Sequence, residues 1–399
     1  MAWRKRFGDS INVTRLKKSS YIYNLVATVV SATTLAYFFW HFKIEITVTD
    51  FFYDADTPRT LLYVTDPSNA ISSIRPFLFL VSWIPYVFNT ILQPYLAWCL
   101  FNVCCILIST FAIRRIFWEI DIPLRNLGFL LTNLSLLCWT VVPDTFIVGI
   151  TFFVLGVLVY GDGSKSYRVI LSGIVATSLN VFFLVPWLTA HILLGRKTLV
   201  QSVGRAFASI TIVAFMLLSS QYLQRFKPLV QSVDGRTSMD VTKPFRKLPF
   251  YDELGILSSI DSIRWFHSPF IGLGENLLSF FTAPWTQGYR YVSGTWAVDS
   301  DFLPFAVLFL AVLLTVASYF GIYFMRKENR VFVSFVFCLE IATCILFLTY
   351  STHPFLFAPF VFASRIFGLI FFVYKFETAF FPLILISSIL TVSSLQYMP

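Results

Sequence analysis

The sequence predicts an all-α integral membrane protein with about ten transmembrane helices and two large external loops. The chain has 399 residues, of which 57% are hydrophobic and only 13% are charged, whereas soluble domains usually carry about 25% charged residues. A water-soluble fold of this composition would expose large apolar patches, which soluble monomers rarely do. The apolar residues also fall into runs close to the roughly 20 residues that cross a bilayer.

The expected spans begin after a basic N-terminus, 1–20, with an apolar run at 21–42. The others are expected at 94–113, 126–142, 146–160, 169–179, 181–194, 204–222, 303–325, 331–350, 355–374 and 378–396. Prolines break 76–91, which is either a short interfacial helix or part of a span. The chain thus divides into an N-terminal transmembrane module at 21–222 with an acidic external loop at 43–75, a large external loop at 223–302, and C-terminal helices at 303–399.

The placement of Lys and Arg sets the orientation. With the N-terminus in the cytoplasm, cytoplasmic segments hold 18 of the 30 basic residues, the short external loops hold 3, and the long loop holds 8. Cytoplasmic loops of membrane proteins carry this excess. No basic face is interleaved with aromatic residues, so nucleic acid is not an expected partner. Both large loops, and any chemistry they carry, are expected on the external face.

The six cysteines all fall in apolar segments, without the spacing of a metal site or a disulfide framework. They are interpreted as small buried hydrophobic residues. No phosphate-binding glycine loop, metal motif or catalytic triad is recognisable, and no cofactor is expected.

An acidic cluster follows the first predicted helix, in the segment VTDFFYDADTPR. Asp54 and Asp56 are two residues apart, so an extended backbone would point both to one side. A carboxylate at a membrane surface can deprotonate a hydroxyl if its surroundings tune its pKa. The alternative is a solvated acidic loop that turns at Thr57–Pro58. The spacing alone leaves both interpretations open.

Two further candidates lie at external helix ends. Asp144, in VVPDTF, lies at the tip of a tight hairpin, where it is either a helix N-cap or a functional carboxylate. His353, in THPFLFAP, emerges on the same face; it is either structural or a contact for a phosphate or hydroxyl.

Glu340 and Arg365 are charges expected near the middle of their spans. Such residues usually face the interior and pair with each other, or mark a pathway. One hypothesis is an ion pair that braces two helices. The other is that Arg365 binds a lipid-borne phosphate, which suits a guanidinium.

The long loop is rich in aromatic residues after Trp265. Trp285, Tyr289 and Trp296 are candidates for stacking against sugar rings. The alternative is anchoring at the membrane surface, where Trp and Tyr concentrate.

This layout resembles the GT-C glycosyltransferases, polytopic enzymes that use polyprenyl-phosphate sugars. The matching features are the acidic YDADTP, the proline-broken segment, the hairpin tip VPDTF, the paired helices of LSGIVATSLNVFFLVPWLTAHILLGRK, and THPFLFAP. Within the family, the length and the late loop resemble the phage-type O-antigen glucosyltransferases, which modify bacterial surface polysaccharide. The resemblance implies an inner-membrane enzyme.

The same resemblance implies the roles of the site residues. Asp54 or Asp56 would be the base that activates the acceptor hydroxyl, with Asp144 positioning the acceptor or the base. Arg365, His353 and Arg59 would bind the donor phosphate. The expected partners are a polyprenyl-phosphate sugar, a polysaccharide or lipid-linked glycan acceptor, and membrane lipids. A polysaccharide polymerase and a lipid-linked sugar flippase remain alternatives, although internal repeats, common in transporters, are not found.

Overall fold

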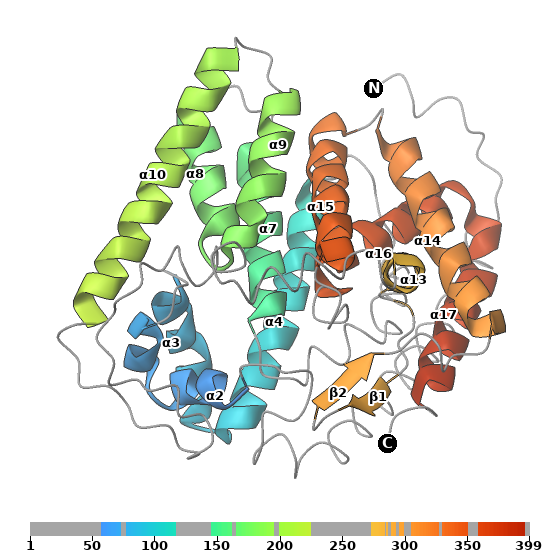
Figure 1. The fold of residues 1–399 in the computed structure, drawn as a ribbon, viewed down its shortest axis with the longest axis horizontal. Helices are drawn as coiled ribbons and strands as arrows, with labels where there is room; N and C mark the ends of the chain where they lie inside the picture. Colours follow the sequence, from blue (N-terminus) through green and yellow to red (C-terminus); the bar gives the residue numbers. More distant parts are fainter. Residues whose placement is uncertain are drawn as a thin grey trace, which may run out of the picture.

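The computed structural model describes residues 57–72, 77–116, 145–161, 165–194, 199–224, 273–283, 285, 289–292, 295–298, 305–326, 329–349 and 358–395 (Figure 1). Helices make up nearly all of these residues, as predicted. The exception is a short antiparallel hairpin, in which Tyr291 pairs with Trp296.

The first group of elements precedes the long loop of the sequence. It comprises α2 (Thr57–Thr65), η1 (Pro67–Ser72), α3 (Leu78–Asn89), α4 (Pro94–Ile116), α7 (Phe146–Tyr160), α8 (Ser166–Thr177), η3 (Val181–Phe183), α9 (Leu184–Leu194) and α10 (Leu199–Gln224). The second group comprises α13 (Leu273–Thr282), β1 (Tyr289–Val292), β2 (Thr295–Val298), α14 (Phe305–Met325), α15 (Arg330–Thr349), α16 (Ala358–Lys375), η6 (Glu377–Ala379) and α17 (Phe380–Leu395).

Most predicted apolar runs coincide with these helices to within a few residues. The helix α7 has the predicted bounds, 146–160, and α14 to α17 match the four runs predicted after residue 302. The runs expected at 21–42 and 126–142 lie outside the described residues. Four of the described features were not predicted: α2, η1, α13 and the β1–β2 hairpin.

Among the described helices, α14 is the one long and apolar enough to cross a membrane by itself. Of the residues in its most apolar stretch, 33% are buried inside the structure, and the others are at least partly exposed. The helices α3 and α4 (as far as Ser109) would form a second span if the pair crosses as one unit.

The helix α3 meets α4 at a sharp bend. The two helices are inclined by 120° across the break before Pro94, where proline can begin a helix but cannot continue the previous one. Both forms that the sequence left open for 76–91, an interfacial helix and part of a span, stay predictions; within this segment, α3 is a helix with its own direction. It packs against α2 and η1 as well as α4.

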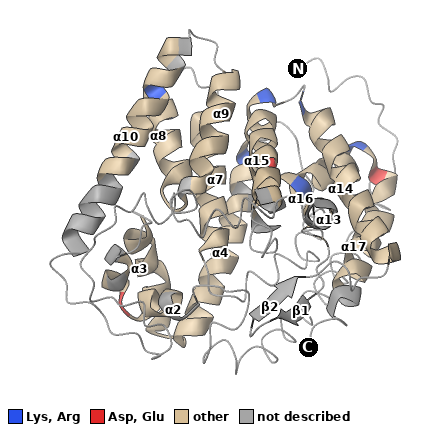
Figure 2. Cartoon of the chain, in the orientation of Figure 1, with Lys and Arg blue, Asp and Glu red and all other residues tan. Residues whose placement is uncertain are grey.

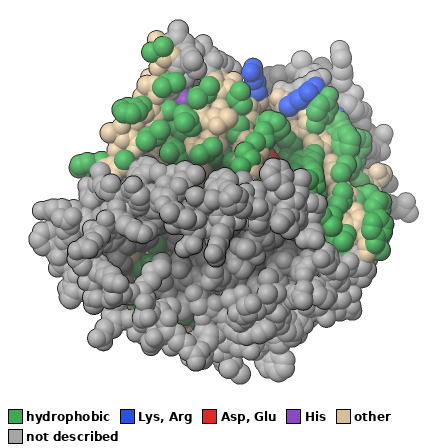
Figure 3. Space-filling view, viewed as in Figure 1, with side chains coloured by type: hydrophobic (Ala, Val, Ile, Leu, Met, Phe, Trp, Pro, Cys, Tyr) green, Lys and Arg blue, Asp and Glu red, His purple; other side chains and the backbone are tan. Residues whose placement is uncertain are grey.

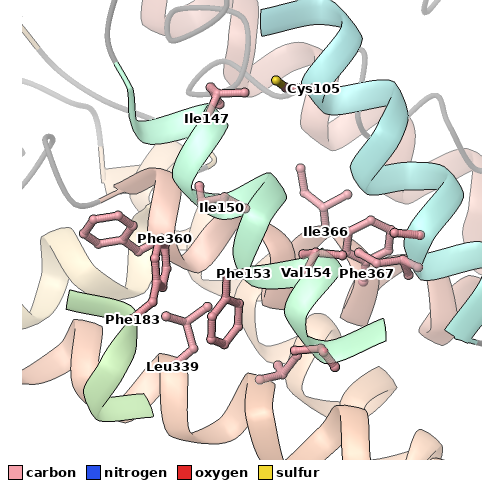
Figure 4. Packing of buried hydrophobic residues seen from close by; sticks show 14 of the residues in the cluster. Cys105, Ile147, Ile150, Phe153, Val154, Phe183, Leu339, Phe360, Ile366 and Phe367 are labelled. Carbon is pink, nitrogen blue, oxygen red and sulfur yellow. The ribbon is translucent and has the colours of Figure 1, made fainter. Parts of the chain in front are cut away.

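The core joins the two groups of helices around α7. Phe153 of α7 stacks on Phe183, with ring centroids 4.9 Å apart, and meets Phe335 of α15 edge-on at 6.3 Å. Figure 4 shows Phe153, Phe183 and Leu339 pointing into one space beside α7. These side chains are almost fully buried. The two groups of helices therefore pack together through interdigitated side chains rather than through surface contacts.

Helices α14 and α16 approach each other most closely at two glycines. A Cβ atom on Gly321 would overlap the backbone carbonyl of Gly368, and a Cβ on Gly368 would overlap that of Ser318. Small residues at such crossings let two backbones touch, as is common where membrane helices pack. Gly321 and Gly368 therefore set the separation of α14 and α16.

Basic side chains collect at one end of the bundle. The amide of Asn329, before α15, donates to the carbonyl of Ile116 at the end of α4 (3.2 Å), and Tyr160 and His191, near the ends of α7 and α9, are hydrogen-bonded at 3.0 Å. These helix ends therefore lie together. The basic side chains placed there are Arg115, Lys165, Arg168, Arg205, Arg326, Arg330 and Lys375. We call this the basic end; Figure 2 shows it in the upper half of the view.

Apolar side chains cover the outside of the helices. On α14 they recur every three or four residues along one face: Phe305, Phe309, Leu313, Val316, Phe320 and Tyr323. Matching stripes occur on α15 (Phe337, Ile341, Ile345) and α17 (Phe381, Leu385, Ile389). Figure 3 shows such side chains across the described part of the visible face. Soluble monomers rarely expose apolar faces of this extent.

We predict that Gly321→Ala lowers the free energy of unfolding by about 1–3 kcal/mol, because the added methyl group overlaps a backbone carbonyl and the helices must separate. Gly204→Ala in α10 is the matched control: apart from its chain neighbours and the nearby backbone of its own helix, nothing lies within 4 Å of its Cβ position, so alanine should be neutral or stabilising by up to about 1 kcal/mol. Thermal unfolding of the purified protein measures both. Equal effects would contradict the proposed close approach.

Candidate functional site

Arg365 and Glu340 form an ion pair in the interior of the second group of helices. The Nη2 atom of Arg365 lies 3.3 Å from Oε2 of Glu340, and Nε lies 3.3 Å from Oε1. The Arg365 side chain is fully buried and Glu340 is 6% exposed. Both residues lie near the middle of their helices, α16 and α15. The ion-pair hypothesis for these two charges is confirmed.

The structure gives all five N–H groups of Arg365 an acceptor within the protein. Nε and one Nη2 hydrogen go to Glu340, and the second Nη2 hydrogen goes to the Tyr319 hydroxyl at 3.2 Å. Nη1 donates to the carbonyls of Phe280 and Ala283. A phosphate at Arg365 would therefore have to displace at least one of these acceptors. The donor-phosphate role of Arg365 stays a prediction, and this geometry does not favour it.

Through Nη1, Arg365 also caps α13. The last carbonyls of a helix lack partners within the helix and carry partial negative charge, so a buried cation there is stabilising. The guanidinium carbon also lies 4.4 Å from the centroid of the Phe280 ring, a cation–π contact. One side chain of α16 thus holds the end of α13 against α14 and α15.

The carboxylate of Glu340 is held by two hydroxyl groups as well. Ser364 donates to Oε1, and Tyr319 donates to Oε2 at 3.2 Å. A buried ion pair offsets its desolvation only with such additional hydrogen bonds. The cluster of Tyr319, Glu340, Ser364 and Arg365, here called the Arg365 cluster, is neutral as a unit and internally satisfied.

Trp285, a candidate for sugar stacking, lies inside the structure. It is 1% exposed, and its indole N–H donates to the Thr315 hydroxyl of α14 at 2.9 Å. Thr315 in turn donates to the carbonyl of Phe281. Trp285 therefore helps to fasten the end of α13. Its sugar-stacking role stays a prediction that requires this turn to move outward, and surface anchoring does not fit its burial.

Most other predicted site residues lie outside the described residues: Asp54, Asp56, Asp144 and His353. The N-cap of α7 is Thr145, one residue after the cap predicted at Asp144. Arg59 lies in the first turn of α2, directly after the acidic segment. Tyr289 and Trp296 lie on β1 and β2, where Tyr289 pairs with Val298.

The roles of Tyr319, Ser364 and the carbonyls of α13 were not predicted from the sequence. Tyr319 and Ser364 could not be separated from the many other Tyr and Ser residues without the crossing of α14 and α16. The helix α13 had a detectable signal, because NLLSFF is an apolar run inside an otherwise polar loop, ended by Ala-Pro. That run was too short to be taken for a span.

A second polar cluster lies near the basic end. Tyr160 is hydrogen-bonded to Nδ1 of His191, and the Trp187 ring stacks on that imidazole with centroids 5.5 Å apart. Trp187 donates to the Ser172 hydroxyl at 2.9 Å. These residues connect α7, α8 and α9.

Within the described ranges, no three His, Cys, Asp or Glu side chains come close enough to hold a metal ion. Comparison with protein-family models, curated proteins and solved structures found no match to this chain.

We predict that Arg365→Leu alone lowers the free energy of unfolding by about 3–5 kcal/mol, because it leaves the Glu340 carboxylate buried without its cation. Adding Glu340→Leu should restore part of that loss, since no charge then remains buried. Thermal or denaturant unfolding of the two single variants and the double variant gives the coupling between the residues.

The matched control for this cycle is Arg330→Gln, an exposed cation at the start of α15, which should change stability by no more than about 0.5 kcal/mol. If Arg365→Leu were as mild as this control, the ion pair would not be structural.

Proposed function

We propose that the chain is a membrane glycosyltransferase. It would move a hexose, glucose by the resemblance, from a polyprenyl-phosphate donor to a surface polysaccharide or lipid-linked glycan, on the external face of a bacterial inner membrane. The observation that carries the proposal is the order of the described helices. The bent α3–α4 pair follows the acidic segment, α7 follows the Pro-Asp tip, and the short helices α8 and α9 follow in turn, which is the layout of the GT-C resemblance.

Two features support placement in a membrane. The helices carry exposed apolar faces on their outer sides, which a bilayer would cover. The basic end also agrees with the cytoplasmic loops assigned from the sequence. The integral membrane architecture of about ten helices is part of this proposal.

The proposed reaction is a displacement at the anomeric carbon of the donor sugar. Asp54 or Asp56 takes the proton of the acceptor hydroxyl, whose oxygen forms the new glycosidic bond. The bond to the phosphate oxygen breaks at the same time, so the configuration inverts. Cationic groups stabilise the negative charge on the departing phosphate. Because this leaving group is attached to a lipid, no nucleotide is required on the external face.

Arg365 has a supporting part in this proposal. Its N–H groups are occupied by Glu340, Tyr319 and α13, so we assign the direct phosphate contacts to His353 and Arg59. Arg365 would instead hold α13, and with it the end of the long loop, against the bundle. Tyr289 and Trp296, on the hairpin that follows, are the proposed acceptor-binding residues.

The Arg365 cluster also bears on the alternative function, a lipid-linked sugar flippase. Transporters place polar groups at mid-membrane, and this cluster lies in the middle of α15 and α16. The mid-helix position of the cluster favours a flippase, but its hydrogen bonds do not. A transport site must form hydrogen bonds with its cargo, whereas the polar groups of this cluster are already bonded to one another. We therefore keep glycosyl transfer as the main proposal.

We predict that membranes containing the chain transfer labelled sugar from a synthetic polyprenyl-phosphate donor to bacterial lipopolysaccharide. Asp54→Asn or Asp56→Asn should reduce transfer by about 10²–10⁴-fold, the contribution typical of a general base. Protein amounts in the membranes are matched by immunoblot before rates are compared.

The matched control is Asp66→Asn. Asp66 is an exposed carboxylate at the end of α2, and it accepts a hydrogen bond from the backbone N–H of Ser68 at 2.9 Å. This variant should retain transfer. If all three variants kept full activity, the acidic segment would not supply the base; protein-dependent movement of the lipid-linked sugar without transfer would favour the flippase.

A further inference from the structure

We propose that the corner formed by α14 and α16 at the basic end binds an anionic phospholipid. The headgroup would contact Arg326 and Lys375, and an acyl chain would lie along the exposed face of α14. This inference rests on the membrane placement proposed above and is independent of glycosyl transfer.

The corner is built by the parallel ends of the two helices. Past their closest approach at Gly321 and Gly368, the ring of Phe324 meets the ring of Phe376 with centroids 5.5 Å apart. Arg326 and Lys375 follow or end these helices, and both side chains are exposed. Two cations thus lie at neighbouring helix ends, beside an exposed aromatic ring.

Arg326 is held in place by Tyr323. The guanidinium carbon lies 3.9 Å from the ring centroid, and Nη2 donates to the Tyr323 hydroxyl at 2.9 Å. A guanidinium fixed against a ring loses less entropy when it binds a ligand, and its planar donors match two phosphate oxygens. This contact uses one of its five donors, so Arg326 retains the capacity to bind a phosphodiester.

The apolar stripe of α14 leads directly to this cation. It lies on α14, a helix of 21 residues, and runs from Phe305, which is 83% exposed, to Tyr323, which is 52% exposed. At 1.5 Å per residue the helix is about 30 Å long, close to the hydrocarbon thickness of a bilayer. Tyr323 lies where aromatic residues concentrate at the membrane surface. A ligand with a charged head and an apolar tail fits this arrangement. A free phosphate would contact only the cations and leave the apolar stripe exposed.

Among the described residues, the charges near the corner are three cations and one anion; Lys327 and Glu328, which follow Arg326 in the sequence, lie outside the described residues. Arg330 begins the neighbouring helix α15, and Glu377 lies two residues after Lys375. Arg326 and Lys375 also offset the partial negative charge at the C-terminal ends of α14 and α16. Offsetting the helix dipoles would not require the exposed apolar stripe of α14 to end at Arg326. An anionic lipid accounts for both the cations and the stripe.

The test uses the full chain in neutral detergent and measures its unfolding temperature as phosphatidylglycerol is added. Phosphatidylcholine with the same acyl chains and soluble glycerol phosphate are the comparison ligands. Phosphatidylglycerol should raise the unfolding temperature, because it binds only the folded state, and the other two should not. Arg326→Gln and Lys375→Gln should each weaken the apparent affinity about fivefold, with little change in unfolding temperature without lipid.

The matched control is Arg168→Gln, which removes an exposed cation from the same end on α8. It should bind phosphatidylglycerol as the unmodified chain does. Equal stabilisation by phosphatidylcholine, equal weakening by Arg168→Gln, or the same response to glycerol phosphate would each overturn the proposal. A chain that remains soluble without detergent would overturn the membrane placement as well, whereas a chain without transferase activity would affect only the proposed enzyme.

Discussion

The arrangement of the second group of helices depends on the neutralisation of Arg365. A guanidinium in the interior has no water to hydrate it, so every donor must find an acceptor in the protein. The acceptors come from three other helices: Glu340 of α15, Tyr319 of α14 and the carbonyls at the end of α13. A shift of any one helix would leave a charged donor unpaired. The position of α13 is therefore tied to the positions of α14, α15 and α16.

The ion pair and the glycine crossing depend on each other. Ser364, which donates to Glu340, lies four residues before Gly368 on α16, and Ser318 approaches Gly368 from α14. Small residues at this crossing bring the backbones close enough for Tyr319 of α14 to reach both members of the pair. A larger residue at Gly321 or Gly368 would separate the helices and lengthen these hydrogen bonds. Packing at the crossing thus determines the electrostatics of the cluster.

The sequence predicted the helices because long apolar runs specify them directly. It also offered the Glu340–Arg365 pair as one of two hypotheses, since opposite charges at mid-helix usually pair or mark a pathway. It did not predict α13, whose ten residues are too few for a span, or its capping by Arg365, which depends on how four helices cross. The β1–β2 hairpin did have a local signal, because Tyr-Arg-Tyr-Val and Thr-Trp-Ala-Val are joined by Ser-Gly.

The sequence was less informative about the role of Trp285, for a physical reason. An aromatic residue in a polar loop is consistent with an exposed stacking surface, a surface anchor or a buried plug, and composition does not distinguish them. Trp285 can be buried because its indole N–H has a hydrogen-bond acceptor inside the structure, the hydroxyl of Thr315. Thr315 and Arg365 together bind the carbonyls of Phe280, Phe281 and Ala283. The segment from α13 to Trp285 was expected to lie wholly in the external loop. It instead packs inside the bundle, because Thr315 and Arg365 satisfy the carbonyls at the end of α13.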